Sequence, residues 1–83
     1  MRTATYVSEA PNFKTDAILW KLDEPIGGYE LVITSIADND FAKETMVFGY
    51  TPEDGVDWSD LEWYSDSPSH IDALTRLGYE IVA

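Results

Sequence analysis

The chain has 83 residues, of which 45% are hydrophobic and 13% aromatic, and these proportions indicate one globular domain over residues 1–83. Sixteen acidic residues against five basic ones give a formal net charge of −11, which disfavours direct binding to nucleic acid or to a membrane surface. The absence of cysteine excludes disulfides and thiolate metal sites and favours a cytoplasmic location. We also expect neither a signal peptide nor a membrane span, because no run of the sequence has the apolar length that these segments require.

The first part of the chain predicts two strands. Residues 3–7 are rich in β-forming side chains and are followed by a Pro-Asn turn signal. In residues 17–22, the side chains of Ile18, Trp20 and Leu22 alternate with their neighbours. This alternation places the three apolar side chains on one face of a half-buried strand.

Two further strands are predicted after the glycine pair Gly27-Gly28, which supplies a turn. Residues 29–36 form the most β-rich run of the chain, and residues 44–50 continue the pattern. The links between the predicted strands are short and rich in turn residues. They predict an antiparallel meander and argue against βαβ units.

Residues 51–66 contain aromatic and acidic side chains and permit two local structures. Trp58, Leu61 and Tyr64 recur at helical spacing, and on that basis we predict a loop with a helical turn. The alternation of Leu61 and Trp63 with polar neighbours is instead typical of a short strand.

The last seventeen residues predict one short helix followed by one strand. Ser67 can cap the helix, Pro68 suits its first position, and Gly78 suits the left-handed residue that ends it. Isolated helices of under about 12 residues are marginal in water, so this helix needs a surface to lie on.

We therefore predict an α+β fold, with an antiparallel meander of four or five strands and one C-terminal helix packed on a face of the sheet. The apolar residues Ile71, Leu74 and Leu77 are expected to hold the helix on the sheet. Residues 79–82 are expected to return as a final strand beside the central ones.

The order of several short patterns also resembles a known group of proteins. The patterns are Trp20-x-Leu22-x-x-Pro25, Tyr29 with a Val/Ile run ending at Ser35, Glu44-Thr45, Asp57-Trp58-Ser59-x-Leu61 and His70-x-x-Ala73-Leu74-x-x-x-Gly78-Tyr79-Glu80. In this region the chain looks like the small uncharacterised proteins encoded by actinobacterial phages, mycobacteriophages among them. The resemblance implies a setting, the host cytoplasm, but it implies no activity, because such proteins have no assigned catalytic or binding residues.

Enzymatic motifs are absent from the sequence, and we expect the protein not to be an enzyme. His70 is the single histidine, and we interpret it as a packing or hydrogen-bonding residue, because catalytic and metal sites need two or three converging groups. A chain of this length is also expected to lack room for a substrate pocket of about 300 Å³ or more.

The acidic residues between 54 and 62 invite a metal-site interpretation, since carboxylates are ligands for calcium and magnesium. Their spacing does not fit an EF-hand loop, because Gly55 follows immediately after the first acidic pair, Glu53 and Asp54. We therefore expect no metal, no cofactor and no catalytic residue.

Recognition of another protein is the function that these features favour. No Lys or Arg occurs between Lys43 and Arg76, and aromatic residues accompany the acidic ones in that interval. Trp and Tyr side chains anchor interfaces, and carboxylates steer a basic partner. We expect a non-enzymatic, phage-type accessory protein that binds a host or phage protein through a surface made of Asp57, Trp58, Asp60, Glu62, Trp63 and Tyr64.

Three alternatives remain open at this stage. Trp58 and Tyr64 can instead serve mainly as core residues. The carboxylates can imitate a phosphate array, which would make the protein a nucleic-acid mimic that inhibits a DNA-binding protein. The Val/Ile-rich strands can also pair through an uncovered sheet edge, which would make a homodimer.

Overall fold

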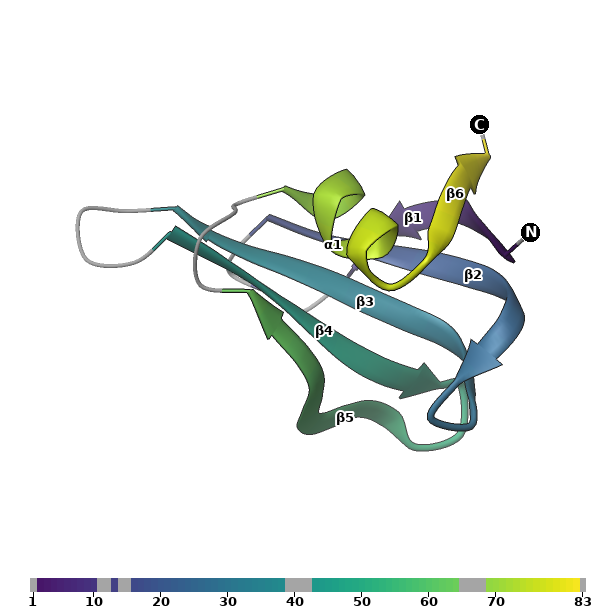
Figure 1. Cartoon of the computed structure of the whole chain (residues 1–83). Coiled ribbons are helices and arrows are strands. Elements are labelled where there is room, and N and C mark those ends of the chain that lie inside the picture. The colour runs from purple at the N-terminus through teal and green to yellow at the C-terminus, as the bar shows by residue number, and fades with distance from the viewer. Residues whose placement is uncertain (1, 11–12, 14–15, 39–42, 65–68, 83) are drawn as a thin grey trace.

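The computed structural model describes residues 2–10, 13, 16–38, 43–64 and 69–82, apart from the side chains of Asp38 and Asp60. In chain order the elements are β1 (Arg2–Glu9), β2 (Asp16–Ile26), β3 (Tyr29–Asp38), β4 (Lys43–Thr51), β5 (Gly55–Tyr64), α1 (His70–Arg76) and β6 (Tyr79–Val82). Across these described residues the six strands form one sheet in the order β5-β4-β3-β2-β1-β6, and α1 lies on one face of it (Figure 1).

The predicted antiparallel meander is confirmed, because strands β1 to β5 each pair antiparallel with the next strand along the chain. The predicted number of four or five strands is too low, since the described part of the chain has six. The prediction of a loop with a helical turn within residues 51–66 is also wrong, because β5 occupies most of that segment. The alternative interpretation as a strand was the correct one.

The irregular pairing of β5 explains why its sequence was misleading. Val47 pairs with Glu62 and Gly49 pairs with Asp57, so one residue of β4 lies opposite residues 58–61 of β5. Such a bulge interrupts the two-residue alternation that marks a strand. Pairing with β4 on both sides of the bulge still gives β5 backbone partners, and this outweighs the local helical spacing.

The expected position of the last strand is wrong as well. β6 lies at an edge of the sheet and pairs parallel with β1, from Arg2 with Tyr79 to Thr5 with Val82. The central strands already have neighbours on both sides, so β6 can pair only at an edge, and it does so on the outer side of β1. Because β5 and β6 lie at opposite edges, the segment that contains α1 crosses one face of the sheet (Figure 1).

The helix begins later than predicted. Ser69 has extended backbone angles, φ −145° and ψ 123°, and its hydroxyl oxygen accepts a hydrogen bond from the backbone N–H of Asp72 at 3.2 Å. Ser69 is therefore the N-cap, and the first helical residue is His70. The predicted cap, Ser67, and the predicted first position, Pro68, lie outside the described residues.

The helix packs on the sheet as predicted, with one exception. Ala73 and Leu74 are buried, and Leu77 packs against the same core. Ile71 is 59% exposed, so its expected packing on the sheet is wrong. Gly78 has φ 92°, which confirms the left-handed glycine after the helix.

The two faces of the sheet differ in how they are covered. The face below α1 carries the main core, which consists of Ala4, Trp20, Leu22, Val32, Val47, Ala73, Leu74 and Tyr79. Ile18 packs against that core, so the predicted shared face of Ile18, Trp20 and Leu22 is confirmed. The opposite face carries a smaller cluster, in which Ala10, Ala17 and Ile33 are buried. We call this second face the open face.

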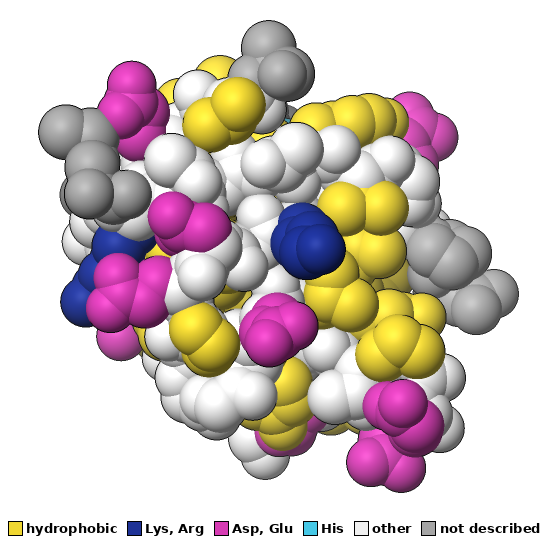
Figure 2. All heavy atoms as spheres, turned by 90° about the vertical axis from the view of Figure 1, so that its right-hand side faces the viewer, with side chains coloured by type: hydrophobic (Ala, Val, Ile, Leu, Met, Phe, Trp, Pro, Cys, Tyr) yellow, Lys and Arg dark blue, Asp and Glu magenta, His cyan; other side chains and the backbone are white. Residues whose placement is uncertain are grey.

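Acidic side chains lie between hydrophobic patches on the surface. Figure 2 shows the end of the molecule at which the chain termini lie, and basic side chains are few there. None of the helices in the described ranges is long and apolar enough to cross a membrane.

Candidate partner-binding surface

Strand β5 places two of the six expected binding residues on the open face. The ring of Trp58 contacts those of Phe13 and Phe48, with centroids 5.4 and 5.5 Å away. Trp63 pairs with Met46, which lies two positions from Phe48 along β4 and therefore points to the same face. Trp58 is 67% exposed and Trp63 is 55% exposed.

Two other expected binding residues, Asp57 and Tyr64, point to the face that carries α1. The carboxylate of Asp57 accepts hydrogen bonds from the hydroxyl of Tyr29 and, at 3.0 Å, from the backbone N–H of Ser59. These hydrogen bonds, chiefly the one from Tyr29, lower the pKa of Asp57. Tyr64 packs against the main core with the guanidinium of Arg76 5.0 Å from its ring centroid, and burial raises its pKa.

Glu62 is exposed, and its pairing with the core residue Val47 places it on the same face as Tyr64. Asp60 belongs to β5, but its side chain is outside the described set. The structure therefore brings Trp58 and Trp63 together on the open face and separates them from Asp57 and Tyr64.

The open face also holds aromatic residues that the sequence did not predict to be part of the site. Phe13 comes from the β1–β2 connection, and its ring centroid lies 6.1 Å from that of Phe48. Tyr50 follows Phe48 by two residues on β4 and packs against the smaller cluster. We call Phe13, Phe48, Tyr50, Trp58 and Trp63 the aromatic surface. The spacing of Met46, Phe48 and Tyr50 was the one sequence signal for it, because alternate residues of a strand share a face.

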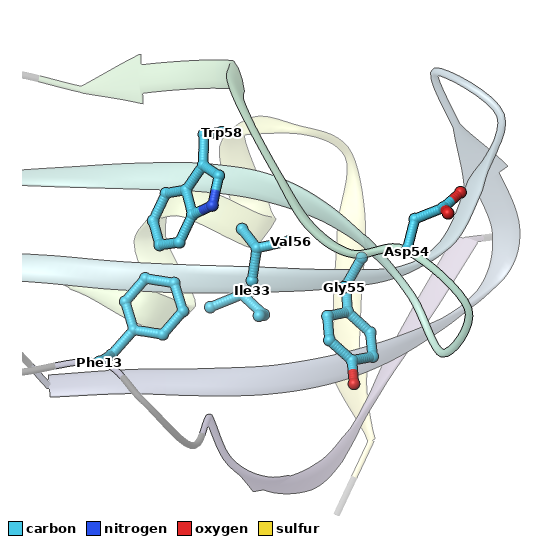
Figure 3. Close-up of a pocket in the computed structure, with 7 residues that line it drawn as sticks. Phe13, Ile33, Asp54, Gly55, Val56 and Trp58 are labelled. Carbon is cyan, nitrogen blue, oxygen red and sulfur yellow. The ribbon is translucent and has the colours of Figure 1, made fainter.

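A hollow of about 310 Å³ lies within this surface. Trp58 and Phe13 stand at one end of it, Ile33 and Val56 form its floor, and Gly55 and Asp54 lie at the other end (Figure 3). The expectation that so short a chain lacks room for a hollow of this size is therefore wrong. A second hollow, of about 680 Å³, lies between α1 and β6.

Carboxylates accompany the aromatic surface. The indole N–H of Trp63 donates a hydrogen bond to Oε2 of Glu44 at 2.7 Å. Asp54 belongs to the β4–β5 turn, where its backbone N–H donates to the hydroxyl of Thr51 at 3.1 Å. The aromatic surface thus has acidic groups at two places along its border.

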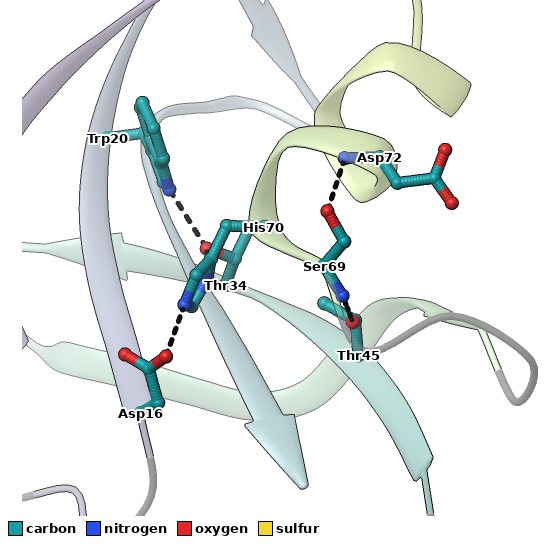
Figure 4. Close-up of polar contacts among 7 residues, drawn as sticks. All are labelled: Asp16, Trp20, Thr34, Thr45, Ser69, His70 and Asp72. Atoms are coloured by element: carbon teal, nitrogen blue, oxygen red, sulfur yellow. Dashed lines mark hydrogen bonds and ion pairs between the residues drawn. The ribbon is translucent and has the colours of Figure 1, made fainter. Parts of the chain in front are cut away.

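His70 belongs to a separate polar cluster beneath α1 (Figure 4). Its Nδ1 lies 2.6 Å from the hydroxyl oxygen of Thr34, which also accepts a hydrogen bond from the indole N–H of Trp20 at 2.9 Å. On its other side, Nε2 lies 3.3 Å from Oδ2 of Asp16 without a hydrogen bond of ordinary geometry.

This order of carboxylate, imidazole and hydroxyl resembles a catalytic triad, but the hydroxyl is inaccessible. Thr34 is 0% exposed, so no substrate can reach it. The cluster instead connects α1 to β2 and β3. His70 thus has hydrogen-bonding partners that the sequence did not indicate.

No metal site is evident in the part of the chain that the structure describes, because no three His, Asp or Glu side chains gather there in a suitable arrangement. No family model matches the chain, and comparisons with curated proteins and with solved structures found no significant match.

Proposed function

We propose that this chain is a non-enzymatic, phage-type accessory protein that binds a basic host or phage protein through the aromatic surface. The observation that supports this proposal is the exposure of Trp58 and Trp63, 67% and 55%, on the same face of the sheet. Clusters of exposed aromatic side chains on a rigid sheet are typical of interaction sites.

The energetics of burial favour these two residues as anchors. Covering a large apolar side chain contributes about 1.5–3 kcal/mol when it was exposed before binding. Trp58 loses little mobility on binding, because Phe13 and Phe48 already hold its ring. Preorganisation of this kind is what distinguishes an anchor from a mobile surface side chain.

The charge of the protein defines the class of partner. A net charge of −11 attracts a positively charged protein and repels acidic ones and nucleic acid. Glu44 and Asp54 place two of the carboxylates beside the aromatic surface. A basic protein surface with apolar side chains is therefore the complement of this face.

Affinity purification from an actinobacterial lysate tests the proposal. The unmodified protein and the variant Trp58→Ala/Trp63→Ala are immobilised in parallel, and the recovered proteins are compared. We expect a basic protein to be recovered with the unmodified chain and lost with the double variant. Ile71→Ala is the matched control, since Ile71 is exposed on α1, away from the open face.

Equal recovery of the same partner with the double variant would contradict the proposal. The same preparation separates the nucleic-acid mimic from ordinary protein binding. If the partner is a DNA-binding protein and DNA displaces the chain from it, the carboxylates rather than the aromatic surface carry the function.

A further inference from the structure

The hollow in the aromatic surface has walls of different chemistry. Its floor is aliphatic, with Ile33 and Val56, and one end is the exposed ring of Trp58. At the other end, Asp54 carries its carboxylate at the rim and outward, as Figure 3 shows. An occupant that complements the aliphatic floor, the ring of Trp58 and the carboxylate of Asp54 must be apolar along its length and positively charged at its tip.

The aromatic rings do not surround a space of their own. The centroids of Phe13, Phe48 and Trp58 are 5.4 to 6.1 Å apart, so the three rings pack against one another and form a single wall. A compact cation enclosed by rings on all sides does not fit this arrangement. A long side chain does fit, because its apolar stem can lie along this wall and the aliphatic floor while its charged end lies beyond the rings, near Asp54.

We propose that this hollow receives an arginine side chain of the basic partner. The methylene groups of the arginine lie beside Trp58 and on Ile33 and Val56, and the guanidinium lies at the opposite end of the hollow, where it approaches Asp54 at the rim. Lysine is a poorer occupant, since its ammonium is a point charge that cannot bind a carboxylate in a two-pronged manner. The proposal rests on the proposed function and names the side chain that the aromatic surface recognises.

Charge complementarity supports this occupant over an apolar side chain. A leucine would fill the floor of the hollow but would make no interaction with the carboxylate of Asp54 at the rim. The net charge of −11 lowers the energy of any cation at this surface. At about 310 Å³ the hollow is at the small end of ligand sites, which suits one side chain better than a large cofactor.

Nuclear magnetic resonance with a short peptide tests the inference directly. The probe is acetyl-Gly-Gly-Arg-Gly-Gly-amide, titrated into the ¹⁵N-labelled protein, with matched peptides that carry lysine, citrulline or leucine. We expect the arginine peptide to shift the indole signal of Trp58 and the amide signal of Gly55, and to bind at least about fivefold more tightly than the citrulline peptide. Citrulline has nearly the same shape as arginine but no charge.

Matched variants place the binding in the hollow. Trp58→Ala should abolish the shifts, whereas Trp63→Ala should preserve them, because Trp63 does not line the hollow. Asp54→Asn should weaken binding several-fold, whereas Glu62→Gln, which removes the same charge outside the hollow, should have little effect.

Equal affinity for the arginine and citrulline peptides, no binding, or shifts confined to other parts of the protein would overturn the inference. The failure of the inference is distinguishable from failure of the proposed function. If Trp58→Ala/Trp63→Ala loses the captured partner while Asp54→Asn keeps it and the arginine peptide does not bind, only the arginine site is wrong. If the peptide binds in the hollow while the double variant still captures the partner, the proposed function is wrong.

Discussion

The hydroxyl oxygen of Thr34 lies 2.6 Å from Nδ1 of His70 and so joins β3 to the first turn of α1. The indole of Trp20 is a donor only, so the hydroxyl oxygen of Thr34 is the acceptor of that bond. A hydroxyl group has one proton and two acceptor lone pairs, so it can also form a hydrogen bond with Nδ1 of His70. One buried hydroxyl thus satisfies polar groups of β2 and α1 at once.

Replacing Thr34 by valine should destabilise the protein although the side-chain volume is nearly unchanged. The variant Thr34→Val leaves the indole N–H of Trp20 and Nδ1 of His70 without their shared partner. An unsatisfied buried polar group costs about 1–3 kcal/mol, and urea unfolding measures the loss. Thr34→Ser is the control, since it keeps the hydroxyl. A Thr34→Val protein at least as stable as the serine variant would show that these hydrogen bonds do not stabilise the fold.

The cap of α1 should matter more than is usual, because the helix has only seven residues. Ser69→Ala removes the oxygen that accepts from the N–H of Asp72, and we expect a loss of about 1 kcal/mol in the free energy of unfolding. Ser69→Asp retains a capping oxygen and should recover most of that loss. Indistinguishable urea midpoints for the alanine and aspartate variants would contradict this role of Ser69.

Gly49 provides space for the ring of Tyr29 on the face below α1. A Cβ atom at position 49 would lie 2.5 Å from Cδ2 of Tyr29, which is much closer than a van der Waals contact. Gly49→Ala should therefore cost about 1–3 kcal/mol. The same substitution in a Tyr29→Ala background should cost much less, because the opposing ring is gone. An equal cost in both backgrounds, measured by chemical unfolding, would rule out the steric explanation.

Tyr79 should make the protein sensitive to alkaline pH. Burial raises its pKa above the ordinary value of 10.0, so the unfolded chain releases the phenolic proton first. The contribution of Tyr79 is complete below about pH 10 and is lost as the pH rises through its raised pKa. The free energy of unfolding of the unmodified protein should fall over that range.

Tyr79→Phe separates this titration from the packing of the ring. The variant loses the hydrogen bond of 2.5 Å from the Tyr79 hydroxyl to the backbone oxygen of Glu24, which should cost about 0.5–1.5 kcal/mol at neutral pH. Its stability should then decline less steeply above about pH 10 than that of the unmodified chain. Some decline should remain, since the pKa of Tyr64 is raised by burial as well. Parallel stability curves for the two proteins would contradict the assignment.

Much of the fold followed from local patterns in the sequence. Alternation placed Ile18, Trp20 and Leu22 on one face, because side chains of a strand point to opposite faces in turn. Gly78 marked the end of α1, because its positive φ is readily available only to glycine. The antiparallel meander followed from short links rich in turn residues, which leave no room for crossover connections.

Pairing between distant segments decided what the sequence left open. Strand β5 formed in spite of helical spacing because β4 supplied backbone partners on both sides of a bulge, and β6 went to an edge because the inner strands already had two neighbours each. The aromatic surface is a tertiary feature in the same sense. Phe13, Phe48 and Trp58 come from three separate segments, and only the sheet brings their rings into contact. The sequence by itself determined the charge, the aromatic content and most strands, whereas the tertiary structure decided which of those side chains share a face.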